Sequence, residues 1–193
     1  MRIDPATGLA AGARQLTSPN ADERPDGCDI SLIVVHCISL PPGEFGGDWI
    51  ERFFCNRLPA DAHPYFAEIS SMQVSAHALI RRDGELVQFV PFHRRAWHAG
   101  VSNFHGRERC NDFSIGIEME GTDDGRYEEA QYQTLATLIH ALSIAYPDID
   151  QEAITGHSDI APGRKTDPGP GFDWQRLHQE LDRLRTESDS SIR

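Results

Sequence analysis

The sequence predicts a single α/β domain, and three segments indicate this. Residues 30–37 are β-branched and apolar on both faces, which is typical of a strand buried inside a sheet. Residues 112–121 alternate strictly along the chain, as a strand with two distinct faces does. Residues 128–146 repeat apolar side chains at helical spacing, and a proline follows them. A chain of 193 residues suits one domain with a sizeable core, so we expect residues 1–193 to fold together.

Before the first strand, residues 1–29 contain many turn-forming prolines and glycines and little periodicity, so we expect an N-terminal arm that wraps over the domain. The strand then ends near His36, which alternation places on the same face as Leu32 and Val34. A histidine there is either a satisfied core residue or, where the strand end faces a cleft, a rigidly held metal ligand.

The next region combines short helices with a hairpin. We expect a short helix at residues 48–56, because its apolar side chains form a stripe, and another short helix or turn at residues 63–69. Residues 75–81 and 85–91 flank Asp83-Gly84, which is a strong signal for a β-hairpin.

Two histidines lie in or just beyond this hairpin. His77 falls within its first strand, where it is a rival metal ligand or, by the blander interpretation, a packing residue or a support for a ligand. Residues 95–100 then bring Trp97 and His98 together and end in glycine, a combination suited to lining a pocket.

The strand at residues 112–121 has one apolar face and one face that carries Glu118 and Glu120. The pattern alone favours solvent over the second face, which would make both glutamates surface residues. If that face lines a cleft instead, Glu118 is a candidate general base.

The C-terminal part of the chain is mostly helical. The helix at residues 128–146 buries a leucine and isoleucine stripe. Asp173 can cap a last helix that turns Leu177 and Leu181 inward, and the polar tail at residues 186–193 is expected to fray.

Between these helices, residues 155–170 are rich in proline and glycine and cannot continue as a helix or an inner strand. This stiff loop carries His157, Lys165 and Asp167. An imidazole and a carboxylate ten residues apart can converge on one metal ion, and zinc accepts such a mixed set. The alternative is a solvated surface loop.

Composition excludes several classes of function. The formal charge of −12 argues against binding nucleic acid or an anionic membrane, because both need a basic face, and it favours small, diffusible substrates. Residues 1–16 lack the apolar core of a secretory signal, and the longest apolar run, residues 32–35, is far too short to cross a bilayer. The chain has four scattered cysteines that form no CxxC pair: Cys28, Cys37, Cys55 and Cys110. We interpret them as free thiols of a cytoplasmic protein.

Five blocks of sequence stand in a recognisable order: Leu32-Ile-Val-Val-His-Cys-Ile-Ser-Leu-Pro-Pro-Gly-Glu-Phe-Gly-Gly47, Val74-Ser-Ala-His-Ala-Leu-Ile80, Arg95-Ala-Trp-His-Ala-Gly-Val101, Gly106-Arg-Glu-Arg-Cys-Asn-Asp-Phe-Ser-Ile-Gly-Ile-Glu118 and the loop at 155–170. Together they resemble the zinc N-acetylmuramoyl-L-alanine amidases of the cytoplasm, which recycle muropeptides. The resemblance implies a mixed central sheet flanked by helices, a fold shared with phage lysozyme-type amidases and peptidoglycan recognition proteins. It also implies a substrate, the bond between N-acetylmuramic acid and L-alanine, with 1,6-anhydro-muropeptides favoured.

The resemblance assigns roles to eight residues. The implied zinc ligands are His36, His157 and Asp167. Glu118 would handle the water, Lys165 would act as an electrophilic helper, and the implied substrate contacts are Trp97, His98 and Arg109. The chain departs from the family pattern at Cys37, where asparagine is usual, and at Gly163, where glutamate is common. These departures put one substrate contact and the stiffness of the loop that carries Lys165 in doubt.

The residue types fit this chemistry independently of the resemblance. Two histidines and one carboxylate leave the fourth position of zinc open for water, as hydrolysis requires. A glutamate can take the proton of that water, and an ammonium group can face the developing oxyanion.

Three other functions fit the sequence less well. A non-catalytic peptidoglycan-recognition module would lack some of these residues. An amidase that acts on the intact wall would need export, and a zinc peptidase of the His-Glu-x-x-His type would need a helix that the chain lacks.

Overall fold

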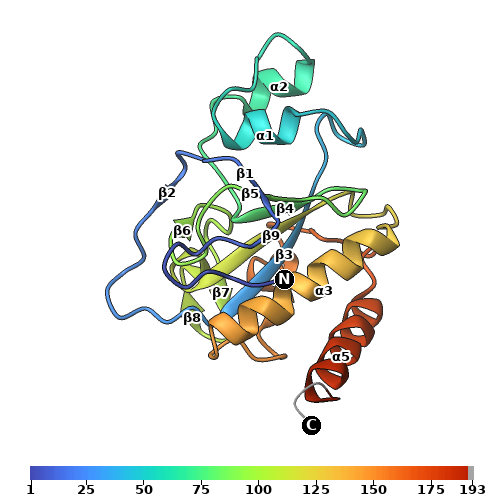
Figure 1. Ribbon diagram of the computed structural model, residues 1–193. Coiled ribbons are helices and arrows are strands. Elements are labelled where there is room, and N and C mark those ends of the chain that lie inside the picture. The colour runs from blue at the N-terminus through green and yellow to red at the C-terminus, as the bar shows by residue number, and fades with distance from the viewer. Residues whose placement is uncertain (191–193) are drawn as a thin grey trace.

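A six-stranded mixed sheet forms the centre of the molecule, and the helices α3 (Glu129–Ala145) and α5 (Trp174–Ser190) lie together to one side of it (Figure 1). The computed structural model describes residues 1–190, with side chains described through residue 187. The predicted α/β fold, with a mixed central sheet flanked by helices, is therefore confirmed.

Four adjacent strands of the sheet are parallel to one another. In spatial order the strands are β1 (Arg14–Gln15), β5 (Leu86–Gln88), β4 (Ala78–Ile80), β9 (Ser114–Glu120), β3 (Leu32–Ile38) and β10 (Ile154–Gly156). Strands β4, β9, β3 and β10 run parallel, whereas β4 and β5 form the predicted antiparallel hairpin. The carboxyl ends of the parallel strands consequently meet at one edge, which is where open α/β sheets place ligand sites.

The shorter elements surround this sheet. Two helices, α1 (Trp49–Phe54) and α2 (Pro64–Ile69), agree with the predicted helices at 48–56 and 63–69 and lie beyond one end of the sheet (Figure 1). The remaining elements are β2 (Ala21–Asp22), β6 (Arg95–Ala96), β7 (Asn103–Phe104), β8 (Arg107–Glu108), the 3₁₀ turn η1 (Cys110–Asp112) and α4 (His157–Ile160). Pairing of β2 with β6 and of β7 with β8 gives two small ribbons.

Alternation along the strands divides the interior into two sides. Odd-numbered side chains of β3 and β9, such as Val35 and Ile117, pack with Leu138 of α3 and Leu177 of α5. The last helix begins as predicted, because the carboxylate of Asp173 accepts a hydrogen bond from a backbone amide of its first turn. The opposite side of the sheet faces loops, α1, α2 and α4, and it carries the functional side chains.

One expectation about these elements needs correction. The second face of β9 is not solvent-exposed, since Ser114 and Glu120 are buried beneath the segment around β6 and the loop at residues 40–47. The N-terminal arm supplies β1 to the sheet edge and β2 to a ribbon. Helix α5 extends to Ser190, into the tail that is expected to fray, while residues 191–193 of that tail lie outside the described residues.

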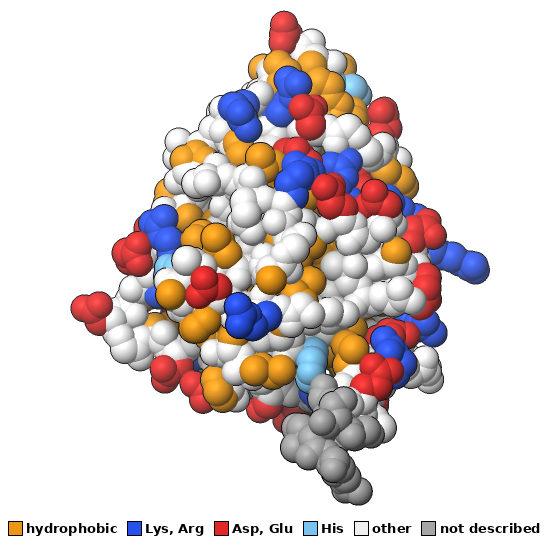
Figure 2. Space-filling view, viewed as in Figure 1, with side chains coloured by type: hydrophobic (Ala, Val, Ile, Leu, Met, Phe, Trp, Pro, Cys, Tyr) orange, Lys and Arg blue, Asp and Glu red, His pale blue; other side chains and the backbone are white. Residues whose placement is uncertain are grey.

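The surface matches the composition. Acidic and basic side chains are interspersed over the face shown in Figure 2. Among residues 1–190, no helix has both the length and the apolar character needed to cross a bilayer.

Candidate metal centre and active site

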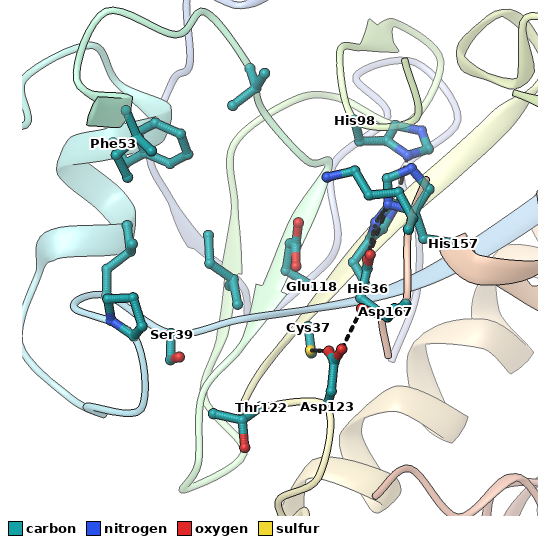
Figure 3. Close-up of a pocket in the computed structure, with 18 of the residues that line it drawn as sticks. His36, Cys37, Ser39, Phe53, His98, Glu118, Thr122, Asp123, His157 and Asp167 are labelled. Carbon is teal, nitrogen blue, oxygen red and sulfur yellow. Dashed lines mark hydrogen bonds and ion pairs between the residues drawn. The ribbon is translucent and has the colours of Figure 1, made fainter. Parts of the chain in front are cut away.

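A cavity of about 570 Å³ opens at the carboxyl edge of the parallel strands. Its lining includes six of the eight residues singled out in the sequence: His36, His98, Glu118, His157, Lys165 and Asp167. Figure 3 shows the imidazoles of His36, His98 and His157 grouped with Asp167, and Glu118 beside them. Segments more than 120 residues apart in sequence thus meet at one point, because His36 and His157 are separated by 121 residues.

Three electron-rich atoms converge within this group. The Nδ1 atoms of His36 and His157 are 3.0 Å apart, and each lies 3.0 Å from Oδ2 of Asp167. A tetrahedral zinc ion with ligands at about 2.0–2.1 Å separates neighbouring ligand atoms by about 3.3 Å. The triangle therefore has nearly the dimensions that a zinc ion requires, and it is the group of three potential ligands found within the described residues.

The hydrogen bonds of the two histidines leave their Nδ1 atoms free for a cation. Nε2 of His157 donates to the carbonyl oxygen of Ala99 over 3.1 Å, so the proton of this ring is on Nε2. Nε2 of His36 lies 2.9 Å from Nδ1 of His98. With Nδ1 lone pairs and a carboxylate turned toward one point, the three groups repel each other unless a positive ion lies between them. The residues present thus fit a divalent metal.

Local structure fixes the loop ligands. His157 begins α4 directly after β10, and this corner is held by Asp159, whose carboxylate accepts hydrogen bonds from Thr155 and from the amide of Gly156. The backbone amide of Ser158 donates to the carbonyl of Asp167 over 2.9 Å, which ties the two ends of the loop together.

The same loop is fastened to the turn that follows β9. Thr166 donates to the carboxylate of Asp123, and the amide of Gly171 donates to the Asp123 carbonyl. Gly169 has φ 77° and approaches so closely that a Cβ there would lie 2.4 Å from Asp123 Cα, so no other residue fits without moving the turn. The thiol of Cys37 also donates a hydrogen bond to the carboxylate of Asp123, over 3.2 Å (Figure 3).

Burial and neighbouring charges set the protonation of the site. Burial would raise the pKa of Asp167, but the imidazoles of His157 and His36 beside its carboxylate outweigh that effect and hold the pKa well below its usual range. Burial lowers the pKa of His36 to about 4, so this ring is neutral and able to bind a metal near neutral pH.

Glu118 is the group with the most unusual surroundings. Burial, reinforced by the charge of Asp167, raises its pKa well above the usual value, while the Lys165 charge acts in the opposite direction. Its Oε2 atom is buried without a hydrogen-bond partner. A buried, unpartnered carboxylate oxygen is costly for the fold, which is typical of a group kept for binding or proton transfer.

Not every predicted site residue reaches the cavity. The indole of Trp97 is turned away and donates to Asp22 of β2, while Arg109 borders a second cavity of about 490 Å³ next to the first. The indole of Trp97 is turned away because it contacts the N-terminal arm, which is distant in sequence. A sequence motif does not reveal such a contact. The assignment of these two residues as substrate contacts stays a prediction.

His77 stands apart from the His36, His157 and Asp167 group that could hold a metal. Its Nδ1 accepts a hydrogen bond from the amide of Gly116, and its Nε2 lies 3.0 Å from the carbonyl oxygen of Arg94. Both ring nitrogens are thus used by the backbone, which supports the packing interpretation over the rival-ligand one. The sequence offered no signal for Asp123 beyond its place in a turn, and this anchor of the loop was missed.

Comparison with known proteins identifies the family. Residues 26–170 match the family described as N-acetylmuramoyl-L-alanine amidase. The chain belongs to this amidase family. The AmpD protein of Escherichia coli K12, named 1,6-anhydro-N-acetylmuramyl-L-alanine amidase, is 63% identical over 170 residues, which are 88% of this chain and 92% of that protein. The amidase therefore resembles its relatives over nearly its whole length, and the predicted enzyme class is confirmed.

Solved structures agree. A crystal structure of a selenomethionine AmpD derivative superposes on the amidase with a TM-score of 0.90 and 59% identity, covering 94% of this chain and 99% of that one. The E. coli amidase AmiD, solved with the substrate anhydro-N-acetylmuramic acid-L-Ala-D-γ-Glu-L-Lys, has a TM-score of 0.57 and 30% identity over 83% of this chain and 65% of AmiD. These relatives favour catalysis over the non-catalytic recognition module.

Proposed function

We propose that this amidase is a zinc enzyme that hydrolyses the amide bond between 1,6-anhydro-N-acetylmuramic acid and L-alanine in muropeptides, as part of cell-wall recycling in the cytoplasm. The observation that carries the proposal is the 3.0 Å triangle of His36 Nδ1, His157 Nδ1 and Asp167 Oδ2 at the wall of a cavity. The substrates printed in the names of AmpD and of the AmiD complex support the anhydro-muropeptide.

In this proposal His36, His157 and Asp167 hold the metal. Zinc bound by three protein ligands supplies Lewis acidity at an open position and lowers the pKa of water to about 7. The chain's own residues then have to orient the amide, accept a proton and stabilise the negative charge that develops.

Glu118 is the proposed proton acceptor. Its raised pKa brings it closer to neutral pH, where a general base works best, and its Oε2 atom is free of any protein partner. After it has taken the proton of the attacking water, the same carboxyl group can pass a proton to the departing amine of L-alanine. General acid–base catalysis of this kind contributes about 10²–10⁴-fold in rate.

Lys165 is the proposed electrostatic partner. It lines the same cavity, and its charge lowers the pKa values of both Glu118 and His36. An ammonium group held there can stabilise the oxyanion that forms when the amide carbon becomes tetrahedral. Gly163, which replaces a common glutamate of the family two residues earlier, has φ 77°, a backbone conformation that suits glycine.

Product analysis tests the proposal. Purified protein is loaded with one zinc per chain and incubated with anhydro-muropeptides and, separately, with intact sacculi. Mass spectrometry should detect free peptide from the muropeptides, and chelation should abolish its release. No peptide from muropeptides, or release from sacculi alone, would contradict the proposed substrate, while release that survives chelation would contradict the role of zinc.

A further inference from the structure

One short loop contacts both metal-binding histidines on the side away from the metal position. Nδ1 of His98 lies 2.9 Å from Nε2 of His36, and the carbonyl oxygen of the next residue, Ala99, lies 3.1 Å from Nε2 of His157. Figure 3 shows the His98 ring standing against His36 and His157. Adjacent residues of the chain therefore contact the outer nitrogen of each imidazole.

A single side chain fixes this loop. Oδ1 of Asn111, in the 3₁₀ turn before β9, accepts hydrogen bonds from the backbone amides of His98 over 3.1 Å and of Ala99 over 2.8 Å. The same turn leads directly into the strand that carries Glu118. Asn111 thereby sets the position of the loop relative to that strand.

The imidazole of His98 packs closely against Ser114 and Gly116 of β9. Its Nε2 lies 3.1 Å from Oγ of Ser114, and a Cβ added at Gly116 would lie 2.4 Å from its Cγ. A side chain at residue 116 would therefore displace the ring, so glycine is required for the contact between His98 and His36.

We propose that His98, Ala99 and Asn111 form a positioning bracket that fixes the direction and the protonated nitrogen of both metal-binding histidines. When a metal binds Nδ1 of His36, the ring proton is on Nε2 and is donated to His98 Nδ1, and His98 in turn donates from Nε2 to Ser114. The Ala99 carbonyl fixes His157 in the same way. The inference rests on the proposed metal site and adds three positioning residues to it. Partners of this kind are worth about 10–100-fold in metal affinity.

The test measures zinc affinity by competition with a chromogenic chelator. Asn111→Leu removes the shared acceptor at nearly constant size, and His98→Phe removes the ring nitrogens. Each should weaken zinc binding by about 10–100-fold. Asn111→Asp and His98→Asn keep an acceptor oxygen at the same place and should bind zinc more tightly than their apolar counterparts. Gln88→Leu is the matched control, because Gln88 is buried, donates to the carbonyl oxygens of Gly8 and Val90, and lies on β5, which β4 and β9 separate from the strand of His36.

A spectroscopic readout separates positioning from general destabilisation. In long-range ¹H–¹⁵N spectra of the zinc-loaded protein, His36 and His157 should carry their protons on Nε2. The Nε2 proton of His36 should exchange faster with water in His98→Phe and at the wild-type rate in Gln88→Leu. If Asn111→Leu does not fold, the two His98 variants decide alone.

Two results would overturn the inference. Wild-type zinc affinity in folded His98→Phe, together with lost affinity in His36→Ala, would contradict the bracket and leave the proposed metal site intact. Wild-type affinity in His36→Ala would contradict the metal site, and with it the bracket.

Discussion

His36 is paired in register with Glu118 in the parallel ladder of β3 and β9. Paired residues of neighbouring strands lie about 4.8 Å apart and point to the same face of the sheet. The proposed metal ligand and the proposed base are thus held by the main-chain hydrogen bonds of two inner strands instead of by mobile loops. A sheet positions both groups more rigidly than loops can.

This arrangement predicts the behaviour of Glu118→Gln. Glutamine keeps the shape of glutamate but cannot take a proton from water, and Glu118 is not among the three residues proposed to bind the metal. The variant should keep its zinc while kcat on an anhydro-muropeptide falls by about 10²-fold or more. KM should change much less. Wild-type kcat in the zinc-loaded variant would remove Glu118 from the mechanism.

Lys165→Ala tests the electrostatic role. Removal of the ammonium group should lower kcat by about 10²–10³-fold, as the loss of an oxyanion donor does, and KM should change little because the charge develops mainly in the transition state. Lys165→Arg retains the charge and serves as the matched variant, with kcat above that of Lys165→Ala. Equal rates for wild type and Lys165→Ala would show that the side chain only solvates its loop.

The sequence predicted which residues belong to this site better than it predicted how they are arranged. The end of a buried strand at His36, the alternation around Glu118 and the stiff loop around His157 are local patterns, and each is found where expected. The register that pairs His36 with Glu118 is set by contacts far apart in sequence, so it could not be derived from either strand alone. For the same reason the pattern misassigned the second face of β9 to solvent. Coverage of that face depends on the segment around β6, which pairs with the N-terminal arm.

Zinc removal provides a third prediction. A ligand that binds only the folded state adds to the free energy of unfolding, so a chelator should lower the melting temperature of the wild type. His157→Ala should bind far less zinc by metal analysis, and its melting temperature should not respond to the chelator. His178→Ala, an exposed histidine on α5, is the control and should respond as the wild type does. Undiminished zinc in His157→Ala would contradict the ligand assignment.

Cys37→Ser tests whether the departure from the family pattern has altered the metal site. The thiol of Cys37 donates to Asp123, and the side chain packs against the apolar core between the sheet and α3, so it is not turned toward the histidine group. Serine can donate the same hydrogen bond. The variant should keep one zinc per chain and most of its kcat toward muropeptides. A marked loss of zinc would show that Cys37 takes part in metal binding.

Acid should destabilise the fold in a way that depends on His77. Burial, with a smaller contribution from the charge of Arg24, lowers the pKa of His77 to about 3 from the ordinary 6.5. The unfolded chain therefore binds a proton below pH 6.5 that the folded protein takes up only near pH 3, so this histidine's contribution to stability is complete above pH 6.5 and declines as the pH falls toward 3. Two pH units below 6.5, the loss reaches about 2–3 kcal/mol of unfolding free energy. Urea unfolding of the metal-free protein at pH 8 and pH 4.5 measures this difference. It should be smaller in His77→Gln than in the wild type, and unchanged in His178→Gln. Because each protein is compared with itself at two pH values, a general loss of stability in His77→Gln does not affect the result. The same pH dependence in His77→Gln and wild type would show that His77 is not buried in the neutral form.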